Sequence, residues 1–459
     1  MNFKYEFEER WFNKENLDIS SEFLDEIINH NKKIVETNKN SMKFTFVGVL
    51  VYKKEILIII PKYSKELNSE TEKLECIKTI IKVFKCIPNK VIKDNKDSLF
   101  ISNGITEDEI SEIAIADYII KDFRNNGVYI KKHRIKSING KGYTNWLSTI
   151  NIFDPIISNG QPVYTNYINE DIIINNNNFI SNLHVNLYNY LLVKYKSLLG
   201  YSGISLSFDR AKSNLDRLGN KKYILSKIKE ELESTFGDRD INLLKAIYNF
   251  FAQKNDSNSN DLSIFGTTSF DVVWEYICKY IFDDKYEDFK SEIPFPEWYT
   301  NDDIKHESKK NPLIPDTLSV YNQTMFMLDA KYYSIQIDEK DVLGNPGSYD
   351  IIKQYIYEMV FDDETRIQRH RYDSDLNYVS TVSVFIYPKM MEEKFNIFGY
   401  TRHPVLKNKK IINNVYVSPN YAYDLFLNMK KVDENIYEEI IDYNKKKLKL
   451  LFEKSDNKM

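Results

Sequence analysis

Two aspartates and a lysine lie close together in residues 314–331, and their types and spacing could support catalysis. The segment predicts a β-hairpin in which a turn at Asn322-Gln323 sets the pairs, Tyr321 with Thr324, Val320 with Met325 and Leu318 with Met327. In this register Asp316 falls opposite Asp329, and directly opposed residues have Cβ atoms roughly 4.5–5.5 Å apart. Lys331 lies two residues beyond Asp329, so strand alternation places it on the same face.

The chemistry that such a set could perform is metal-assisted hydrolysis of a phosphodiester. Two opposed carboxylates repel each other unless a cation lies between them, and Mg²⁺ prefers carboxylate oxygens. Asp316 and Asp329 would hold the ion, the carbonyl of Ala330 could add a ligand, and the ion would activate a water. Lys331 would orient the nucleophile or offset charge on the phosphate. The alternative is a hairpin with surface charges at one end, but the apolar residues on the same face indicate burial, which favours the functional interpretation.

The spacing of these residues resembles the PD-(D/E)XK nuclease signature, with Pro315-Asp316, twelve residues, and then Asp329-Ala330-Lys331. Residues 265–277 look like the helix that precedes this hairpin in that fold, and residues 349–358 look like the helix that follows it. Together these segments are similar to the LlaJI family of restriction endonucleases. The apolar runs within residues 46–63 also resemble the opening hairpin of that family.

The resemblance implies a Mg²⁺-dependent, type II site-specific deoxyribonuclease of a restriction-modification system, which hydrolyses unmethylated foreign DNA. Glu275 would be the inward acid of the first helix and would help to hold the metal or its water, although a lone acid there could also reach solvent. Gln354 would lie at the active-site end of the second helix, where a solvated polar residue is the alternative. The implied catalytic set is Asp316, Asp329, Lys331, Glu275 and Gln354, and the implied metal set is Asp316, Asp329, Ala330 and Glu275.

The same resemblance implies double-stranded DNA as substrate, a cognate DNA methyltransferase and a possible McrB-like partner subunit that hydrolyses nucleotides. No Gly-x-x-x-x-Gly-Lys-Ser/Thr phosphate-binding loop occurs in the sequence, which fits a nuclease partner of such a subunit. The alternative function is a non-catalytic, McrC-like DNA-binding or regulatory subunit that keeps the nuclease fold. The intact Asp316, Asp329 and Lys331 argue against lost catalysis.

The predicted fold class is α/β (α+β) with several domains, because 459 residues exceed the usual size of one core. Residues 1–155 predict an α+β domain, with a helix over about 20–37, a hairpin over 43–63 and a helix over 70–86. Residues 156–257 predict a mainly helical domain, which ends in a polar linker at 254–261. Residues 262–430 predict a PD-(D/E)XK nuclease core, a mixed sheet flanked by helices, and residues 431–459 predict a charged helical tail.

Charge neither supports nor excludes DNA as a partner. Lysine and arginine total 63 against 67 acids, a net charge of −4, but an acidic protein can group its basic residues. One such group is the basic segment 366–371, which could hold DNA near the active site or form a solvated loop. Lys353 and Glu358, on the helix after the hairpin, are expected at the surface.

The sequence predicts a cytoplasmic protein without membrane contact. No apolar run approaches the roughly 18 residues of a membrane helix, and the first ten residues are too charged for a signal peptide. The three cysteines have no paired spacing, which indicates reduced thiols. The six histidines also lack metal-binding spacing, so a histidine-based nuclease site is not expected.

Overall fold

A computed structural model describes residues 3–30, 34–88, 111–175, 178–201, 215–253, 262–307, 313–337, 340–370, 375–404 and 410–456. The described part of the chain forms two compact units: residues 111–265 make unit 1, and residues 3–88 and 266–456 make unit 2. The polar linker predicted at 254–261 lies outside the described residues. Within those residues, no helix is long and apolar enough to cross a membrane.

The two units group the chain differently from the four consecutive segments expected from the sequence. Residues 111–155 belong with the middle segment, whereas residues 3–88 belong with the C-terminal half. Contacts between segments far apart in the chain decide this grouping, and local sequence patterns do not record them. Domain boundaries inside unit 2 remain a prediction.

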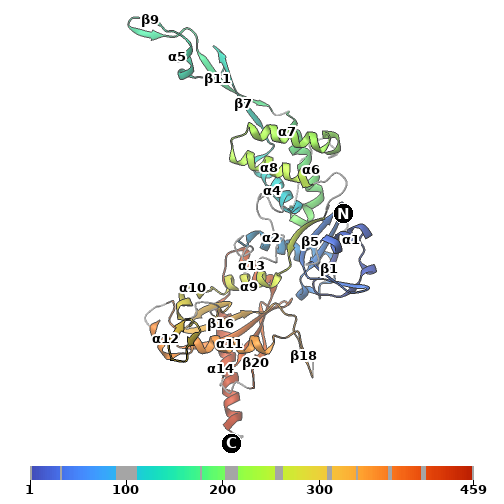
Figure 1. Cartoon of the computed structure of the whole chain (residues 1–459), viewed down its shortest axis with the longest axis vertical. Coiled ribbons are helices and arrows are strands. Elements are labelled where there is room, and N and C mark those ends of the chain that lie inside the picture. The colour runs from blue at the N-terminus through green and yellow to red at the C-terminus, as the bar shows by residue number, and fades with distance from the viewer. Residues whose placement is uncertain are drawn as a thin grey trace. The chain divides into compact units, whose positions relative to one another are not determined.

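Unit 1 combines packed helices with an antiparallel ribbon that extends away from them (Figure 1). The helices are α4 (Glu112–Asn126), α6 (Phe179–Leu199), α7 (Lys221–Glu233) and α8 (Asp238–Gln253), and the ribbon pairs β7 (Lys131–Ile138) with β11 (Ile168–Asn175). Shorter elements on the ribbon are β8 (Tyr143–Thr144), α5 (Trp146–Ile152), β9 (Ile156–Ser158) and β10 (Gln161–Val163). The segment 156–257 contains the predicted helices as α6, α7 and α8, but it begins with three strands that were not predicted, because β11 takes its hydrogen bonds from a distant strand.

Unit 2 begins with a four-stranded sheet in the order β1-β6-β5-β12. Its strands are β1 (Phe3–Phe7), β5 (Val47–Tyr52), β6 (Glu55–Ile60) and β12 (Leu262–Thr267), of which Gly266 and Thr267 belong to unit 2. The predicted hairpin is confirmed as β5 and β6, which pair antiparallel from Gly48↔Ile59 to Tyr52↔Glu55. A Cβ on Gly266 would lie 2.2 Å from the carbonyl oxygen of Val47, so only glycine fits where this strand approaches β5.

The first predicted helix is shorter than expected. Helix α1 (Ser21–His30) is followed by β3 (Val35–Thr37), which pairs with β4 (Ser41–Phe44), and β4 pairs in turn with β2 (Phe12–Asn13). Helix α2 (Glu70–Cys86) matches its predicted span. A capping box fixes its start, because Ser69 and Glu72 each accept a hydrogen bond from the other's backbone N–H.

The second half of unit 2 is a five-stranded mixed sheet in the order β15-β16-β19-β21-β20. Its strands are β15 (Thr317–Tyr321), β16 (Thr324–Ala330), β19 (Ser380–Pro388), β20 (Phe395–Thr401) and β21 (Ile412–Val417). The neighbours β16/β19 and β19/β21 run parallel, and the edge pairs β15/β16 and β20/β21 run antiparallel. The structure thus confirms the predicted mixed sheet.

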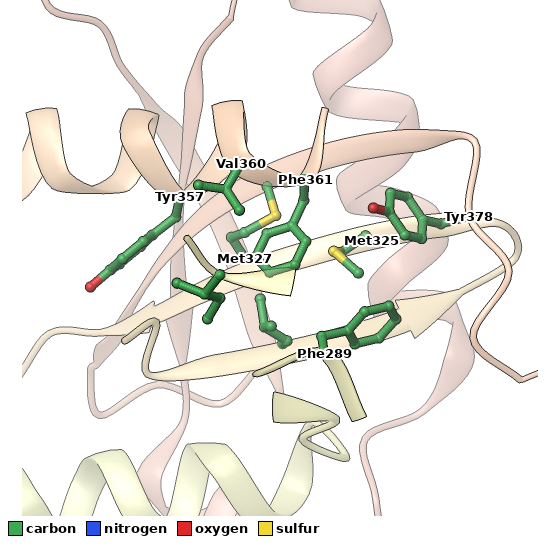
Figure 2. Packing of buried hydrophobic residues seen from close by; sticks show 9 residues of the cluster. Phe289, Met325, Met327, Tyr357, Val360, Phe361 and Tyr378 are labelled. Carbon is green, nitrogen blue, oxygen red and sulfur yellow. The ribbon is translucent and has the colours of Figure 1, made fainter. Parts of the chain in front are cut away.

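Helices α9 (Phe270–Ile281) and α11 (Ser348–Phe361) both contact β16, the strand that carries Asp329. Helices α13 (Pro419–Leu427) and α14 (Glu434–Asp456) follow the last strand, and α13 packs on α9. Figure 2 shows one apolar cluster, in which Met325 and Met327 of β16 meet Tyr357, Val360 and Phe361 of α11. This cluster fixes α11 against the hairpin, so polar residues on the same helix face are held beside the end of β16.

Candidate active site

The hairpin adopts the predicted register. Pairing runs from Tyr321↔Thr324 to Thr317↔Leu328. Both turn residues are left-handed, with φ of 44° at Asn322 and 57° at Gln323. Positive φ at both central positions is the geometry of a two-residue type I′ turn, whose twist matches that of the flanking strands.

This register brings the carboxylates of Asp316 and Asp329 together. Asp316 directly precedes the Thr317↔Leu328 pair, so its position is opposite Asp329. The Ala330 N–H donates to Asp316 Oδ2 at 3.2 Å, and the Asp329 side chain is buried. Burial first, and then the neighbouring Asp329 carboxyl, raise the pKa of Asp316 far above its usual value.

Lys331 lies between two carboxylates. Its ammonium is 2.8 Å from Asp329 Oδ2 and 2.9 Å from Asp350 Oδ1, and its side chain is 11% exposed. Its backbone N–H donates to Ile386 O at 2.8 Å, which continues the β16/β19 ladder past Ala330. Burial disfavours the charged form, yet the pKa of Lys331 is raised because the two carboxylates stabilise the ammonium.

Glu275 approaches the same group from helix α9. Burial, opposed by the neighbouring Lys279, raises the pKa of this half-buried carboxyl, and the charge of Asp329 raises it further. Glu275 and Lys331 both act on the pKa of Asp316. The structure therefore brings together Asp316, Asp329, Glu275 and Lys331. All four were predicted as site residues from the sequence, although Glu275 lies about 40 residues before Asp316.

Gln354 is buried on α11, and its side-chain amide is hydrogen-bonded to the backbone of the sheet. Its Nε2 donates to the carbonyl oxygen of Met327 at 2.6 Å. This bond ties α11 to β16, so Gln354 supports the strand that carries Asp329. The predicted role of Gln354 in catalysis stays a prediction.

Three residues of α11 were missed as site residues from the sequence: Asp350, Lys353 and Tyr357. Asp350 forms an ion pair with Lys331. The charges of Asp316 and Asp329 help to raise the pKa values of both Lys353 and Tyr357. Positions 350, 353, 354 and 357 follow the i, i+3, i+4, i+7 spacing of one helix face. That spacing, with Gln354 already assigned to the inner face, was the signal available in the sequence.

The expectation that Glu358 lies at the surface was wrong. Its side chain is buried and accepts hydrogen bonds from Ser383 Oγ at 2.9 Å and Thr381 Oγ1 at 3.2 Å. Lys410 pairs with it at 3.2 Å. Burial raises the pKa of Glu358, against the opposing effect of Lys410. The helix is amphipathic with a polar inner face, so polarity alone did not mark its solvent side.

The basic segment 366–371 is partly engaged by an acid. Glu292 pairs with Arg369 at 2.9 Å and with His370 at 3.4 Å, and Arg366 donates to the carbonyl oxygen of Val360. Arg371 lies outside the described residues. DNA contact by this segment stays a prediction.

The N-terminal sheet of unit 2 holds the chain just after Lys331. The hydroxyl of buried Tyr332 donates to Glu8, which also accepts from the Lys62 N–H at 3.3 Å. The Lys62 ammonium lies 4.6 Å from the centre of the Tyr332 ring. Burial, only partly offset by Tyr332 and Lys62, raises the pKa of Glu8 to about 7.

The donor set at the end of the hairpin suits a hard divalent cation. Mg²⁺ keeps several waters and is held by one or two carboxylates, so Asp316 and Asp329 suffice as protein ligands. A cation would also relieve the repulsion that raises the pKa of Asp316. No cluster of three or more His, Cys, Asp or Glu suited to an ion occurs among the described residues, and the predicted role of Glu275 at the metal stays a prediction.

Comparisons with known proteins identify relatives among restriction systems. The chain is 28% identical over 456 residues to a Bacillus subtilis (strain 168) protein, type II restriction enzyme BsuMI component YdjA, covering 97% of this chain and 94% of that protein. Two solved structures from Thermococcus gammatolerans are also similar. One is the half-complex of McrB AAA+ hexamers with bound McrC (TM-score 0.42, 11% identity, 93% of this chain and 99% of that chain). The other is the McrBC complex determined by cryo-EM (TM-score 0.26, 13% identity, 55% and 80%).

The family match spans residues 46–420, which include the hairpin β5/β6, the whole five-stranded sheet and every residue of the candidate site. The match therefore extends well beyond the hairpin motif. The chain belongs to the LlaJI restriction endonuclease family.

Proposed function

We propose that this protein is the Mg²⁺-dependent DNA endonuclease subunit of a type II restriction-modification system, which hydrolyses phosphodiester bonds in unmethylated double-stranded DNA. The meeting of Asp316 and Asp329 at the end of a hairpin, beside Lys331, carries the proposal. Two acids held this close on a buried strand end are costly without a cation, and family membership supports a nuclease. The reduced cysteines fit an enzyme that works in the cytoplasm.

Asp316 and Asp329 would hold Mg²⁺, with the carbonyl of Ala330 as a further ligand and Glu275 acting on the ion or on its water. Bound there, Mg²⁺ would lower the pKa of a water and stabilise charge on the phosphate. Lys331 keeps its proton because two carboxylates flank it, so it acts as a fixed positive charge that orients the attacking water. Gln354 would keep β16 in place through Met327.

The proposed partner proteins are inferred from the missing phosphate-binding loop and from the description of the Bacillus subtilis relative. The sequence has no nucleotide-binding loop of the Gly-x-x-x-x-Gly-Lys-Ser/Thr type, and the relative from Bacillus subtilis is described as one component of a restriction enzyme. The proposed system therefore includes a McrB-like nucleotide-hydrolysing subunit and a DNA methyltransferase that protects the host.

A second candidate is a non-catalytic, McrC-like subunit that binds DNA or regulates a partner. One observation favours it: no group of three or more acids suited to an ion occurs in the described part of the chain. Intact Asp316, Asp329 and Lys331 favour the enzyme, because a chain that no longer cuts DNA has no need to keep two repelling acids together.

Metal titration and cleavage separate the two candidates. The full chain and its Asp329→Asn and Asp316→Asn variants are titrated with Mn²⁺ by calorimetry, and cleavage of unmethylated DNA in Mg²⁺ is measured with the other components of the system present. The Asp433→Asn variant is the control, because that exposed acid pairs with Lys394 instead. The proposal expects loss of metal binding and of cleavage in both site variants only. Full cleavage by Asp329→Asn would disprove it, and wild-type protein that binds no metal would favour the regulatory subunit.

A further inference from the structure

Lys353 is a second lysine at the carboxylate pair, and the roles assigned above do not use it. It lies on α11 one turn after Asp350, on the helix face that contacts β16. The charges of Asp316 and Asp329 both act on Lys353, and Lys353 in turn acts on Glu275. Its side chain is half-buried. Its neighbours on that face, Asp350 and Tyr357, contact Lys331 and the carbonyl oxygen of Ile314. Lys353 therefore lies on the side of α11 that borders the carboxylate pair.

The two lysines differ in how far their charge is already neutralised. Lys331 forms ion pairs of 2.8 Å and 2.9 Å with two carboxylates. In the part of the chain that the structure describes, Lys353 forms no ion pair with a carboxylate, and its ammonium lies over the ring of Tyr357. A lysine that already has two anionic partners has less charge to offer a third anion, so Lys353 is the more available cation.

Tyr357 holds Lys353 in place. Its hydroxyl donates to the carbonyl oxygen of Ile314 at 2.6 Å, two residues before Asp316, and the Lys353 ammonium lies 5.3 Å from its ring centre. In Figure 2, Tyr357 lies at one end of the apolar cluster, with its hydroxyl directed away from the other labelled side chains. The cluster buries the ring, so the phenol and the lysine beside it have a fixed position. A fixed cation needs little reorganisation when an anion arrives.

We propose that Lys353 binds a non-bridging oxygen of the scissile phosphate. This inference rests on the proposed nuclease function and adds a substrate contact to it. Asp316 and Asp329 would hold the metal on one side of the phosphate, Lys331 would order the water, and Lys353 would neutralise the phosphate oxygen from α11. Tyr357 acts through Lys353 and is a positioning residue.

The test compares Lys353→Met, which keeps the length of the side chain, with Lys353→Arg, which keeps the charge. The control is Lys447→Met on α14, since Lys447 lies 5.2 Å from the ring centre of Tyr443, four residues away on the same helix. Three quantities are measured on the full chain with the other components present. These are Mn²⁺ affinity by calorimetry, the cleavage rate in Mg²⁺, and the salt dependence of DNA binding in Ca²⁺, where no cleavage occurs.

The proposal expects Lys353→Met to keep its metal affinity and to lose cleavage by roughly 100-fold, the usual effect of removing a group that stabilises transition-state charge. The slope of log K against log salt should become shallower by about 0.9, the value of one phosphate contact. Lys353→Arg should recover most of the cleavage rate and of the salt slope. Lys447→Met should have the cleavage rate and the salt slope of the wild type.

Either of two results would overturn the proposal. One is cleavage by Lys353→Met within a few-fold of the wild type with an unchanged salt slope. The other is a Lys353→Arg variant as inactive as Lys353→Met, since charge would then not be what matters. Both are distinct from failure of the nuclease assignment, which would show as normal cleavage by Asp329→Asn.

Discussion

Lys331 is joined to Asp350 by an ion pair of 2.9 Å that links the end of strand β16 to the first turn of helix α11. The same ammonium contacts Asp329, so the helix fixes the lysine relative to the proposed metal ligands. A group held from two elements keeps its position when substrate binds.

Removing the helix partner should loosen this lysine without removing the metal ligands. We expect Asp350→Asn to lower the cleavage rate by roughly 10-fold, the scale of a small misplacement of a catalytic group, while Mn²⁺ affinity stays near the wild-type value. Cleavage kinetics and calorimetry on the same preparations measure both. Asp442→Asn, an exposed acid on α14, is the control, and equal losses of metal affinity and rate in Asp350→Asn would contradict the assignment.

Thermal stability should reveal the metal site independently of cleavage. In the absence of metal and near neutral pH, Asp316→Asn should melt at a higher temperature than the wild type. Burial and the neighbouring Asp329 raise the pKa of Asp316, and this shift lowers the free energy of unfolding of the wild type at that pH. At Mg²⁺ concentrations about 100 times the dissociation constant, the free energy of unfolding of the wild type should rise by about 2.7 kcal/mol, and that of the variant should hardly change. Differential scanning calorimetry with and without Mg²⁺ measures both. An equal Mg²⁺ effect on the two proteins would exclude this metal site.

Glu8 should make stability depend on pH. Its pKa rises from 4.5 in the unfolded chain to about 7 in the fold, so the folded state holds an extra proton between these values. The stability of the fold that depends on protonated Glu8 is fully present below pH 4.5 and is lost as the pH rises through 7. As the pH rises over that range, the free energy of unfolding of Glu8→Gln should increase by about 3 kcal/mol relative to that of the wild type, at 1.36 kcal/mol per pKa unit.

Urea unfolding at pH 4.5, 6 and 8 measures this difference. Tyr332→Phe is the control, because it keeps Glu8 buried while it removes a hydrogen bond that favours the ionised form. This variant should retain the pH dependence. A Glu8→Gln curve parallel to that of the wild type would mean that Glu8 titrates normally.

The hairpin turn offers a stabilising substitution. Gln323 has a φ of 57°, a conformation that is costly for residues with a Cβ, and glycine is the preferred second residue of this turn type. Gln323→Gly should therefore raise the free energy of unfolding by about 0.5–1 kcal/mol, while Gln323→Ala should not raise it. Urea unfolding of the two variants gives the comparison, and a Gln323→Gly protein less stable than wild type would show that the turn is not left-handed there.

The sequence by itself determined the elements of the C-terminal half and the register of its hairpin. The two-residue turn sets which residues pair, and strand alternation then sets which side chains share a face, so Asp316, Asp329 and Lys331 could be placed from local rules alone. Helices α9 and α11, with Glu275 and Gln354 on them, came from the resemblance to a family.

Only the tertiary structure decided what the inner face of α11 does. Asp350, Lys353 and Glu358 resemble solvated surface residues in the sequence, because helical spacing shows a polar stripe but not what packs against it. Packing on β16 and β19 turns that stripe inward, where one acid binds Lys331 and another is buried with Ser383. The contact of Glu8 with Tyr332 spans 324 residues, and no local pattern encodes a contact at that separation.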